Sequence, residues 1–232
     1  MRGRCICVKR FFDRKHVWLI AGYFALYLLG FQLLEARGPK ELHLIHTVLD
    51  DRIPFCEYFI VPYVLWFFYV AAAVAYFAFF QKSVKEYWQF MISLGIGMTL
   101  FLLVSWFWPN GHDLRPKLPE GGSVFVEMVR MLYRIDTPTN ILPSIHVFNS
   151  LAVAAAVDRC RTLEGRRILR RASWVLAGLI VLSTMFLKQH SVFDVLCGIT
   201  LYGAVYRLVY IRKAFWPVHT PQKRPGWARD FD

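Results

Sequence analysis

Long apolar runs separated by short polar connections dominate the chain. Six runs approach or reach the roughly 20 residues that an α-helix needs to cross the hydrocarbon core of a bilayer. In segments this apolar, length is a better guide than periodicity. We therefore predict an all-α fold, a polytopic membrane protein in which a six-transmembrane helix bundle forms one domain over residues 1–232, with spans near residues 17–35, 57–80, 87–108, 142–157, 173–189 and 191–211.

The first and fourth runs differ from the others. The first follows a basic segment, as the apolar core of a signal peptide does. It is too long for that role and lacks a small-x-small cleavage site, so we expect an uncleaved first span. The fourth run is the shortest and carries Asn149 and Ser150. It is therefore the weakest of the predicted spans.

Composition and charge agree with a membrane protein and orient it. The chain is 56% hydrophobic, 17% aromatic and has a formal net charge of +12. Of its 28 Lys and Arg residues, 20 lie in the two terminal segments and the connections on their side, and eight lie in the opposite connections. The positive-inside rule therefore places both termini in the cytoplasm. Because the basic residues form no face of their own, we expect no nucleic-acid partner.

The cysteines suggest neither a metal site nor a disulfide framework. Cys5, Cys7, Cys56, Cys160 and Cys197 show no metal-ligand spacing, and their odd number cannot close such a framework. Cys5 and Cys7 lie in a basic segment before the first span, where reversible acylation is one interpretation and ordinary free thiols are the favoured one. We find no better metal-ligand set elsewhere, so we predict neither a metal nor a cofactor.

The stretch "KQHSVFDVLCG" combines a histidine and an aspartate at the edge of a span. His190 and Asp194 are four residues apart, so on a helix they share a face and Asp194 can accept the second imidazole N–H. Such a contact fixes the tautomer of His190 and strengthens its free nitrogen as a nucleophile or base. The alternative is a buried His–Asp pair that only ties two helices together.

A second histidine occurs in "NILPSIHVFNS". Pro143 and Ser144 indicate the start of a helix, whose exposed N–H groups form an anion site. His146 would project from its first turn, placed to donate a proton. Alone, a histidine here is most simply an interfacial residue. The predicted topology, however, puts His146 at the same membrane face as His190.

Arg115 is predicted to lie at this face too, in the outer segment "PNGHDLRPKLPEGG". A loop arginine is ordinarily just solvated. Beside two histidines and a helix start, its planar fork suits a phosphate.

Together these residues resemble the three signature motifs of the type 2 phosphatidic acid phosphatase superfamily, which also includes glucose-6-phosphatase and the vanadium haloperoxidases. The resemblance covers about residues 109 to 200, and six spans suit the membrane members of the superfamily. The matching motifs are Arg115-Pro116, Pro143-Ser144-x-His146 and Ser183-x6-His190-x3-Asp194.

The resemblance implies a role for each residue. His190 would attack phosphorus to give a phosphohistidine, Asp194 would orient it, and His146 would protonate the leaving oxygen. The phosphoryl oxygens would be bound by the remaining motif residues, Arg115, Ser144 and Ser183, together with backbone amides.

Two residues depart from the family pattern. Trp108 stands where the first motif has Lys, and Thr184 stands where the third has Arg. The missing charge could come from Lys117, His112 or Lys188. Of these we favour Lys188 because it is two residues from His190, although on an ideal helix it would point elsewhere. A snorkelling interfacial lysine is the alternative.

The sequence therefore predicts a multi-pass cell-membrane enzyme whose site is on the extracytoplasmic face. Its substrate would be a phosphorylated lipid, a phosphomonoester or diphosphate of the phosphatidate or isoprenyl diphosphate class. A third motif without Arg is similar to that of sphingomyelin and inositol-phosphorylceramide synthases, which makes a lipid headgroup phosphotransferase the alternative. Two further alternatives are a proton-coupled transporter that uses the His and Asp residues as a relay, and an inactive scaffold of the same fold. The predicted chemistry gathers at one face, which favours the enzyme.

Overall fold

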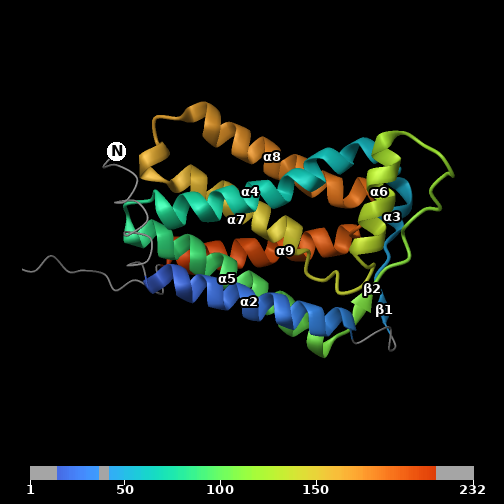
Figure 1. Ribbon diagram of the computed structural model, residues 1–232, viewed down its shortest axis with the longest axis horizontal. Helices are drawn as coiled ribbons and strands as arrows, with labels where there is room; N and C mark the ends of the chain where they lie inside the picture. Colours follow the sequence, from blue (N-terminus) through green and yellow to red (C-terminus); the bar gives the residue numbers. More distant parts are fainter. Residues whose placement is uncertain (1–14, 37–41, 213–232) are drawn as a thin grey trace, which may run out of the picture.

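The computed structural model describes residues 15–36 and 42–212. Within these ranges six helices run lengthwise beside one another (Figure 1). The predicted roles of Cys5, Cys7 and the basic terminal segments fall outside the described residues. The six lengthwise helices are α2 (Lys15–Ala36), α4 (Ile60–Phe79, preceded by the 3-10 turn η1, Glu57–Phe59), α5 (Val84–Phe107), α7 (Ile145–Arg159), α8 (Arg167–Phe186) and α9 (Val192–Tyr206, continued by the π turn η3, Arg207–Ile211).

Five of these helices are long and apolar enough to cross a membrane. They coincide with five of the six predicted runs, so the structure confirms a mostly helical protein and is consistent with a membrane protein. The boundaries of the fifth predicted run, residues 173–189, were wrong: α8 begins six residues before that run and ends three residues before its end. The qualifying segments are Trp18–Ala36, Glu57–Phe79, Val84–Phe107, Arg167–Phe186 and Val192–Ile211.

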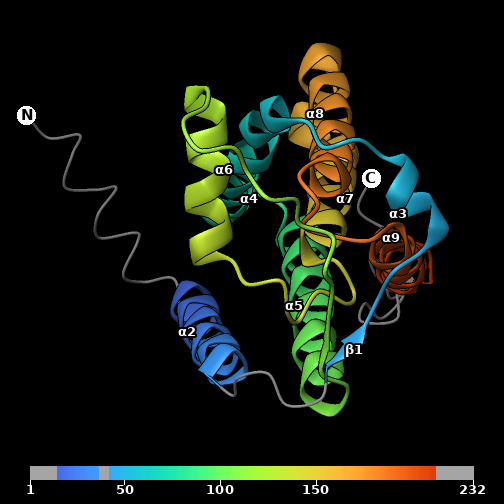
Figure 2. The same ribbon diagram turned by 90° about the vertical axis from the view of Figure 1, so that its right-hand side faces the viewer.

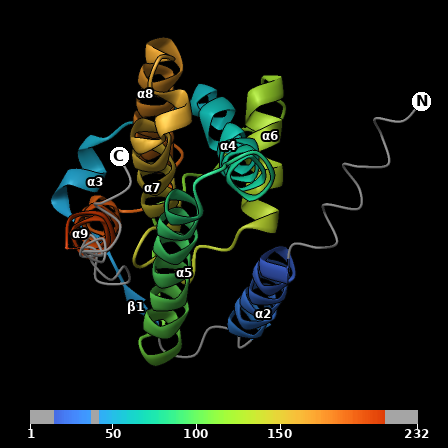
Figure 3. The same ribbon diagram turned by 90° about the vertical axis from the view of Figure 1, so that its left-hand side faces the viewer.

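The remaining lengthwise helix, α7, has 15 residues and is therefore about 22 Å long at 1.5 Å per residue. It is shorter than the roughly 30 Å hydrocarbon core, and it lies in the middle of the bundle. Figure 3, which looks along the bundle, shows α7 surrounded by α4, α5, α8 and α9. Most of its residues are buried, among them Asn149 and Ser150. Shielding from lipid by neighbouring helices explains why this run tolerates polar side chains.

Close packing around α7 depends on small residues. A Cβ atom added to Gly97 of α5 would lie 2.0 Å from the ring of Phe148, and one added to Gly198 of α9 would lie 2.9 Å from the carbonyl oxygen of Ser144. Small residues let helix backbones approach closely, a common basis of helix association in membranes. The start of α7 is therefore pressed against α9.

Bulky apolar side chains cover the outside of the bundle. Exposed fractions reach 69% for Leu26 on α2, 67% for Phe68 on α4 and 85% for Ile168 on α8. Exposed apolar surface this extensive marks a membrane or protein contact, and in helices of this length it fits lipid.

Short elements gather at one end of the bundle, where α8 passes into α9 (Figures 1 and 2). They are β1 (His43–Leu44), α3 (Val48–Arg52), β2 (Asn110–Gly111) and α6 (Val124–Ile135). β1 pairs with β2 in parallel. The Oδ1 atom of Asn110 accepts from the amides of Ile141 and Leu142, each at 2.9 Å, which ties this layer to the chain entering α7.

The packing of α5 on α7 generates a prediction about Gly97. We expect Gly97→Ala to lower the free energy of unfolding by about 1–3 kcal/mol, because the new methyl group must displace a fully buried phenyl ring. Gly178→Ala on α8 is the matched control, since no atom lies within 4 Å of its added Cβ. Thermal unfolding in detergent measures both. Equal melting temperatures would contradict this packing.

Candidate active site

Three side chains of the second and third motifs meet at the end of the bundle. The Nε2 atom of His190 lies 3.4 Å from Nδ1 of His146, and its Nδ1 atom lies 3.6 Å from Oδ2 of Asp194. All three are buried, with exposed fractions of 6%, 9% and 0% for His190, His146 and Asp194. His146 and His190 are 44 residues apart in the chain. The two histidines, which were predicted to lie at one face, are thus in contact at one end of the bundle.

A tight turn between α8 and α9 positions His190. Lys188 adopts a left-handed conformation with φ of 52°, as is common where a helix ends. The amides of Gln189 and His190 both donate to the carbonyl oxygen of Thr184. Helix α9 then begins after its cap, Ser191. His190 therefore precedes the helix, so our expectation that it shares a helix face with Asp194 was wrong, although the two residues still approach.

Asp194 belongs to the first turn of α9. Its Oδ2 atom accepts from the backbone amide of Ser191 at 2.9 Å. The 3.6 Å separation from His190 is longer than a hydrogen bond, and among the described residues His190 Nδ1 and Asp194 Oδ1 have no hydrogen-bond partner. Catalytic hydrogen bonds are often long in ligand-free structures and shorten when substrate binds. Shortened in this way, the contact with Asp194 would place the His190 proton on Nδ1 and leave Nε2, the atom that faces His146 Nδ1, unprotonated.

His146 lies in the first turn of α7, after the cap Ser144. The hydroxyl oxygen of Ser144 accepts from the amide of Val147. The backbone amide of Ser144 donates to the carbonyl oxygen of Asp194 at 3.3 Å. The predicted helix start is therefore confirmed, with Pro143 just before the cap. Two rings from α4 cover the imidazole: the ring centres of Tyr63 and Trp66 lie 4.8 and 4.2 Å from that of His146.

Arg115 lies beside Gln189, the residue that precedes His190. Its guanidinium donates to the carbonyl oxygens of Tyr133 and Asp136 at 3.1 and 2.7 Å and to Oε1 of Gln189 at 2.5 Å. It also lies over the Tyr133 ring, 4.5 Å from the ring centre. Burial lowers the pKa of Arg115, while nearby Asp136 raises it. The side chain is thus held firmly.

Within the described chain, Arg115 and Gln189 each keep one hydrogen-bond donor without a partner. Nε of Arg115 and Nε2 of Gln189 are buried and have no partner among the described residues. The amide orientation of Gln189 follows from its neighbour, because arginine only donates and so must face the amide oxygen. The amide NH2 therefore points away from Arg115. Donors of this kind suit phosphoryl oxygens.

The other predicted phosphate ligands have partners elsewhere. The Ser183 hydroxyl donates to the carbonyl oxygen of Ile180, within its own helix. Lys188 Nζ donates to the carbonyl oxygens of Asp50 and Ile53, each at 2.5 Å. The structure therefore brings Arg115 to Gln189, the residue before His190, but leaves these two polar groups bound to backbone.

Of the positions that depart from the family pattern, Trp108 is 41% exposed and packs against His43, and Thr184 is buried within α8. Lys117 is exposed. His112 is buried and its Nε2 donates to the carbonyl oxygen of Gln189 at 2.9 Å while Nδ1 accepts from Leu114. Burial lowers the pKa of His112 to about 4, so this ring supports the turn as a neutral donor.

Asp50, which the sequence did not single out, anchors α3 beside His190. Its carboxylate accepts from the Ser191 hydroxyl at 2.6 Å, the Val192 amide at 2.8 Å and the amide of Thr47 at 2.7 Å. Burial alone would raise the pKa of Asp50, but these hydrogen bonds outweigh it and the pKa is lowered. With Lys188 bound to the same segment, α3 is attached on both sides of His190.

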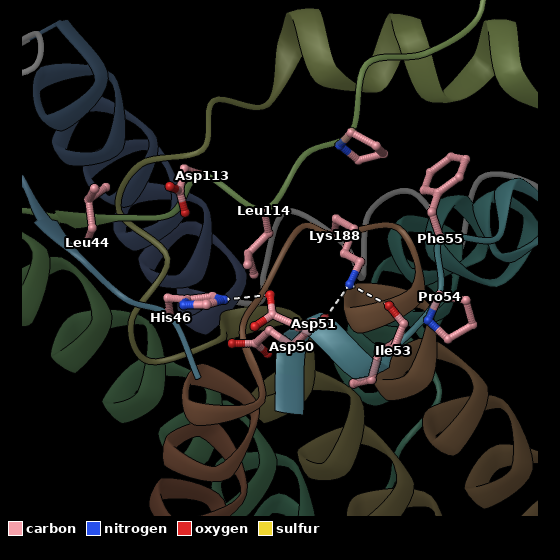
Figure 4. A pocket seen from close by; sticks show the side chains of 11 residues that line it. Leu44, His46, Asp50, Asp51, Ile53, Pro54, Phe55, Asp113, Leu114 and Lys188 are labelled. Atoms are coloured by element: carbon pink, nitrogen blue, oxygen red, sulfur yellow. Dashed lines mark hydrogen bonds and ion pairs between the residues drawn. The ribbon is translucent and has the colours of Figure 1, made fainter. Parts of the chain in front are cut away.

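A cleft of about 740 Å³ opens beside this anchor. In Figure 4 the side chains of His46, Asp50 and Asp51 lie to the left of Lys188 and those of Pro54 and Phe55 to its right. His46 Nε2 bonds Asp51 at 2.8 Å. The lining residues are Leu44, His46, Asp50, Asp51, Ile53, Pro54, Phe55, Asp113, Leu114, Pro116 and Lys188.

Some of these residues carry a weak sequence signal. The Thr47-x-x-Asp50 spacing is typical of a capping box, and the structure contains that box. It does not predict the contact with Ser191, which lies 141 residues away. Trp66 and Tyr63 lie in an aromatic stretch of the sequence, which ordinary core packing explains as well as a place beside His146 does.

Within the part of the chain that the structure describes, no group of three or more His, Cys, Asp or Glu side chains could hold a metal ion. Comparisons of the chain with family models, curated proteins and solved structures found no match. Function is therefore inferred from the geometry of the site.

The anchoring role of Asp50 generates a prediction. Asp50→Asn should lower the free energy of unfolding by about 1.5–3 kcal/mol, because hydrogen bonds to a buried charge are lost, and should speed hydrogen exchange at the Val192 amide. Asp51→Asn removes the same charge from the next residue, whose side chain is 64% exposed, and should change neither. Hydrogen-exchange mass spectrometry of residues 188–194 measures the difference; equal exchange in both variants would refute the anchor.

Proposed function

We propose that this chain is a metal-independent membrane lipid phosphatase of the type 2 phosphatidic acid phosphatase superfamily. It cleaves a phosphomonoester or diphosphate of a lipid through a phosphohistidine at His190. The observation that carries the proposal is the buried series Asp194–His190–His146, in which each side chain approaches the next. Asp194 supplies an orienting carboxylate, His190 a nucleophile and His146 a proton donor.

The proposed reaction has two steps. First, His190 Nε2 attacks phosphorus, the bond from phosphorus to the lipid oxygen breaks, and His146 gives a proton to the leaving alkoxide. Asp194 stabilises the positive charge that develops on His190. Second, His146 takes a proton from water, which attacks phosphorus and releases inorganic phosphate and free His190. The 3.4 Å separation of the two imidazole nitrogens keeps His146 within reach of a phosphoryl group on Nε2.

Open polar atoms around the histidines support a polar ligand. Besides Arg115 and Gln189, the Trp66 Nε1 donor is buried without a hydrogen-bond partner in the described chain. Trp66 contacts His146. A buried polar atom without a partner costs about 1–3 kcal/mol. Their concentration here is explained if a phosphate completes the hydrogen bonding.

Gln189 offers a substitute for one missing family cation. With Trp108 and Thr184 in the usual Lys and Arg positions, Arg115 is the cation that remains at the site, and the neutral amide of Gln189 adds a donor. Transition-state charge on the phosphoryl oxygens would be stabilised by these two groups and by the start of α7.

The proposal includes six spans, with both termini cytoplasmic and the site on the extracytoplasmic face. The two ends of α7 support this count. One end carries His146 beside His190, and at the other Arg159 donates to the Tyr206 hydroxyl at 2.6 Å while Asp158 bonds Arg170. Helix α7 thus joins the same two ends of the bundle as α8 and α9, which fits an even number of crossings and the distribution of basic residues.

Transfer to an alcohol is a second candidate, favoured by the cleft. Its walls include Lys188, two residues from His190, and Leu114, next to Arg115. An acceptor alcohol bound there could replace water in the second step. Release of phosphate without acceptor indicates a hydrolase, whereas turnover only with diacylglycerol or inositol indicates a transferase.

The nucleophile generates the first functional prediction. Purified protein in detergent with a chelator is offered phosphatidate, an isoprenyl diphosphate and a phosphocholine lipid. His190→Ala should reduce phosphate release or headgroup transfer by about 1,000-fold or more, whereas His43→Ala, an exposed histidine on β1, should not. Activity that survives His190→Ala, or that requires a divalent metal, would contradict the mechanism.

The proton donor generates the second. His146→Ala should slow cleavage of a lipid alkyl phosphate by about 100- to 10,000-fold. Formation of the phosphoenzyme from a nitrophenyl phosphate should be affected far less, since nitrophenolate leaves without a proton. Burst-phase kinetics measure that step. An equal loss with both leaving groups would assign His146 another role.

A further inference from the structure

Helix α6 lies in the connection between α5 and α7 and presents three different faces. One face packs on the bundle: Val126 and Val129 are buried, and Val129 belongs to an apolar cluster with Ile60 and Tyr63. A second face carries charge at Glu127, Arg130 and Arg134. The connection was not predicted to contain a helix.

The third face is apolar and exposed. Val124, Met128, Met131 and Ile135 are exposed by 74%, 37%, 64% and 71%. Their spacing of four, three and four residues places them in one stripe along the helix. We call these four residues the α6 stripe. A water-facing stripe of this kind would be unfavourable in a soluble loop.

The direction of α6 differs from that of the six lengthwise helices. In Figure 1 it stands across the end of the bundle, and Figure 2 shows it beside α4 at that end. If the bundle crosses a membrane, a helix placed crosswise at its end lies along the membrane surface. Helices with one apolar and one charged face characteristically bind there.

Phe125, next to Val124 of the α6 stripe, links α6 to the exposed apolar surface of α4. Phe125 of α6 contacts Tyr58, with ring centres 5.2 Å apart, and Tyr58 is itself 60% exposed. From there the exposed side chains continue along α4 through Val61 and Phe68, at 44% and 67%. This continuity favours bilayer lipid over a separate protein partner.

We infer that α6 is an interfacial helix whose apolar stripe is immersed in the leaflet at the His146–His190 end of the bundle, with its charged face in water. A consequence, which rests on the proposed function, concerns Arg115. Its guanidinium is held by carbonyl oxygens at the end of α6, those of Tyr133 and Asp136. The depth of α6 would therefore set Arg115 at the level of lipid phosphates.

The test uses two adjacent residues on different faces. Ile135→Cys and Arg134→Cys are made in a full-length background with the five native cysteines replaced, spin-labelled and reconstituted in phospholipid bilayers. Power-saturation EPR then compares collisions with oxygen, which partitions into lipid, and with a water-soluble nickel chelate. We expect the oxygen-to-nickel collision ratio to be several-fold higher at residue 135.

Two outcomes would overturn the inference. Equal access of nickel to both labels would place the α6 stripe in water. Low access of both reagents to residue 135 would indicate a protein contact, such as a second copy of the chain. The measurement involves no catalysis, so it stands or falls separately from the phosphatase proposal.

Discussion

The contact between the starts of α7 and α9 is the constraint on which the candidate site depends. Gly198 leaves no room for a side chain against the carbonyl oxygen of Ser144, and the amide of Ser144 donates to the carbonyl oxygen of Asp194. These contacts bring two helix starts together, one carrying His146 and the other following His190. A bulkier residue at 198 would separate the two imidazoles as well as the helices.

Hydrogen bonds from neighbouring side chains hold the turn between α8 and α9, which carries Gln189 and His190. Asp50 binds Ser191 and Val192 on one side of His190, and Lys188 binds the α3 segment on the other. His112 donates to the carbonyl oxygen of Gln189. Most polar groups at this end are therefore engaged in positioning, which leaves a small set of open atoms near the histidines. Preorganisation of this kind is what electrostatic catalysis requires.

Much of the helical fold could be predicted from the sequence, because span length is a local property of the chain. Helix topology also places His146 and His190 at one end of the bundle, although their 3.4 Å approach could not be predicted from it. Asp194 does approach His190, but at 3.6 Å without the predicted hydrogen bond and by a different route, in which Ser191 caps α9 and His190 precedes it.

Other features depend on long-range contacts that no local pattern encodes. Lys188 was expected near phosphate, yet its left-handed backbone directs it to the carbonyl oxygens of α3. Ser183 lies within α8, where its hydroxyl donates to the carbonyl oxygen of Ile180 in the same helix. Helix α6 was missed because its 12 residues mix charged and apolar positions for three different surroundings.

In the proposed reaction His190 becomes covalently phosphorylated. The most direct measurement is to mix a phosphate-labelled nitrophenyl ester with the His146→Ala variant, quench in alkali, and locate the label by mass spectrometry. We expect an alkali-stable, acid-labile phosphate on His190 that is absent when His190 is also replaced. Label on another residue, or turnover with no phosphoenzyme, would contradict it.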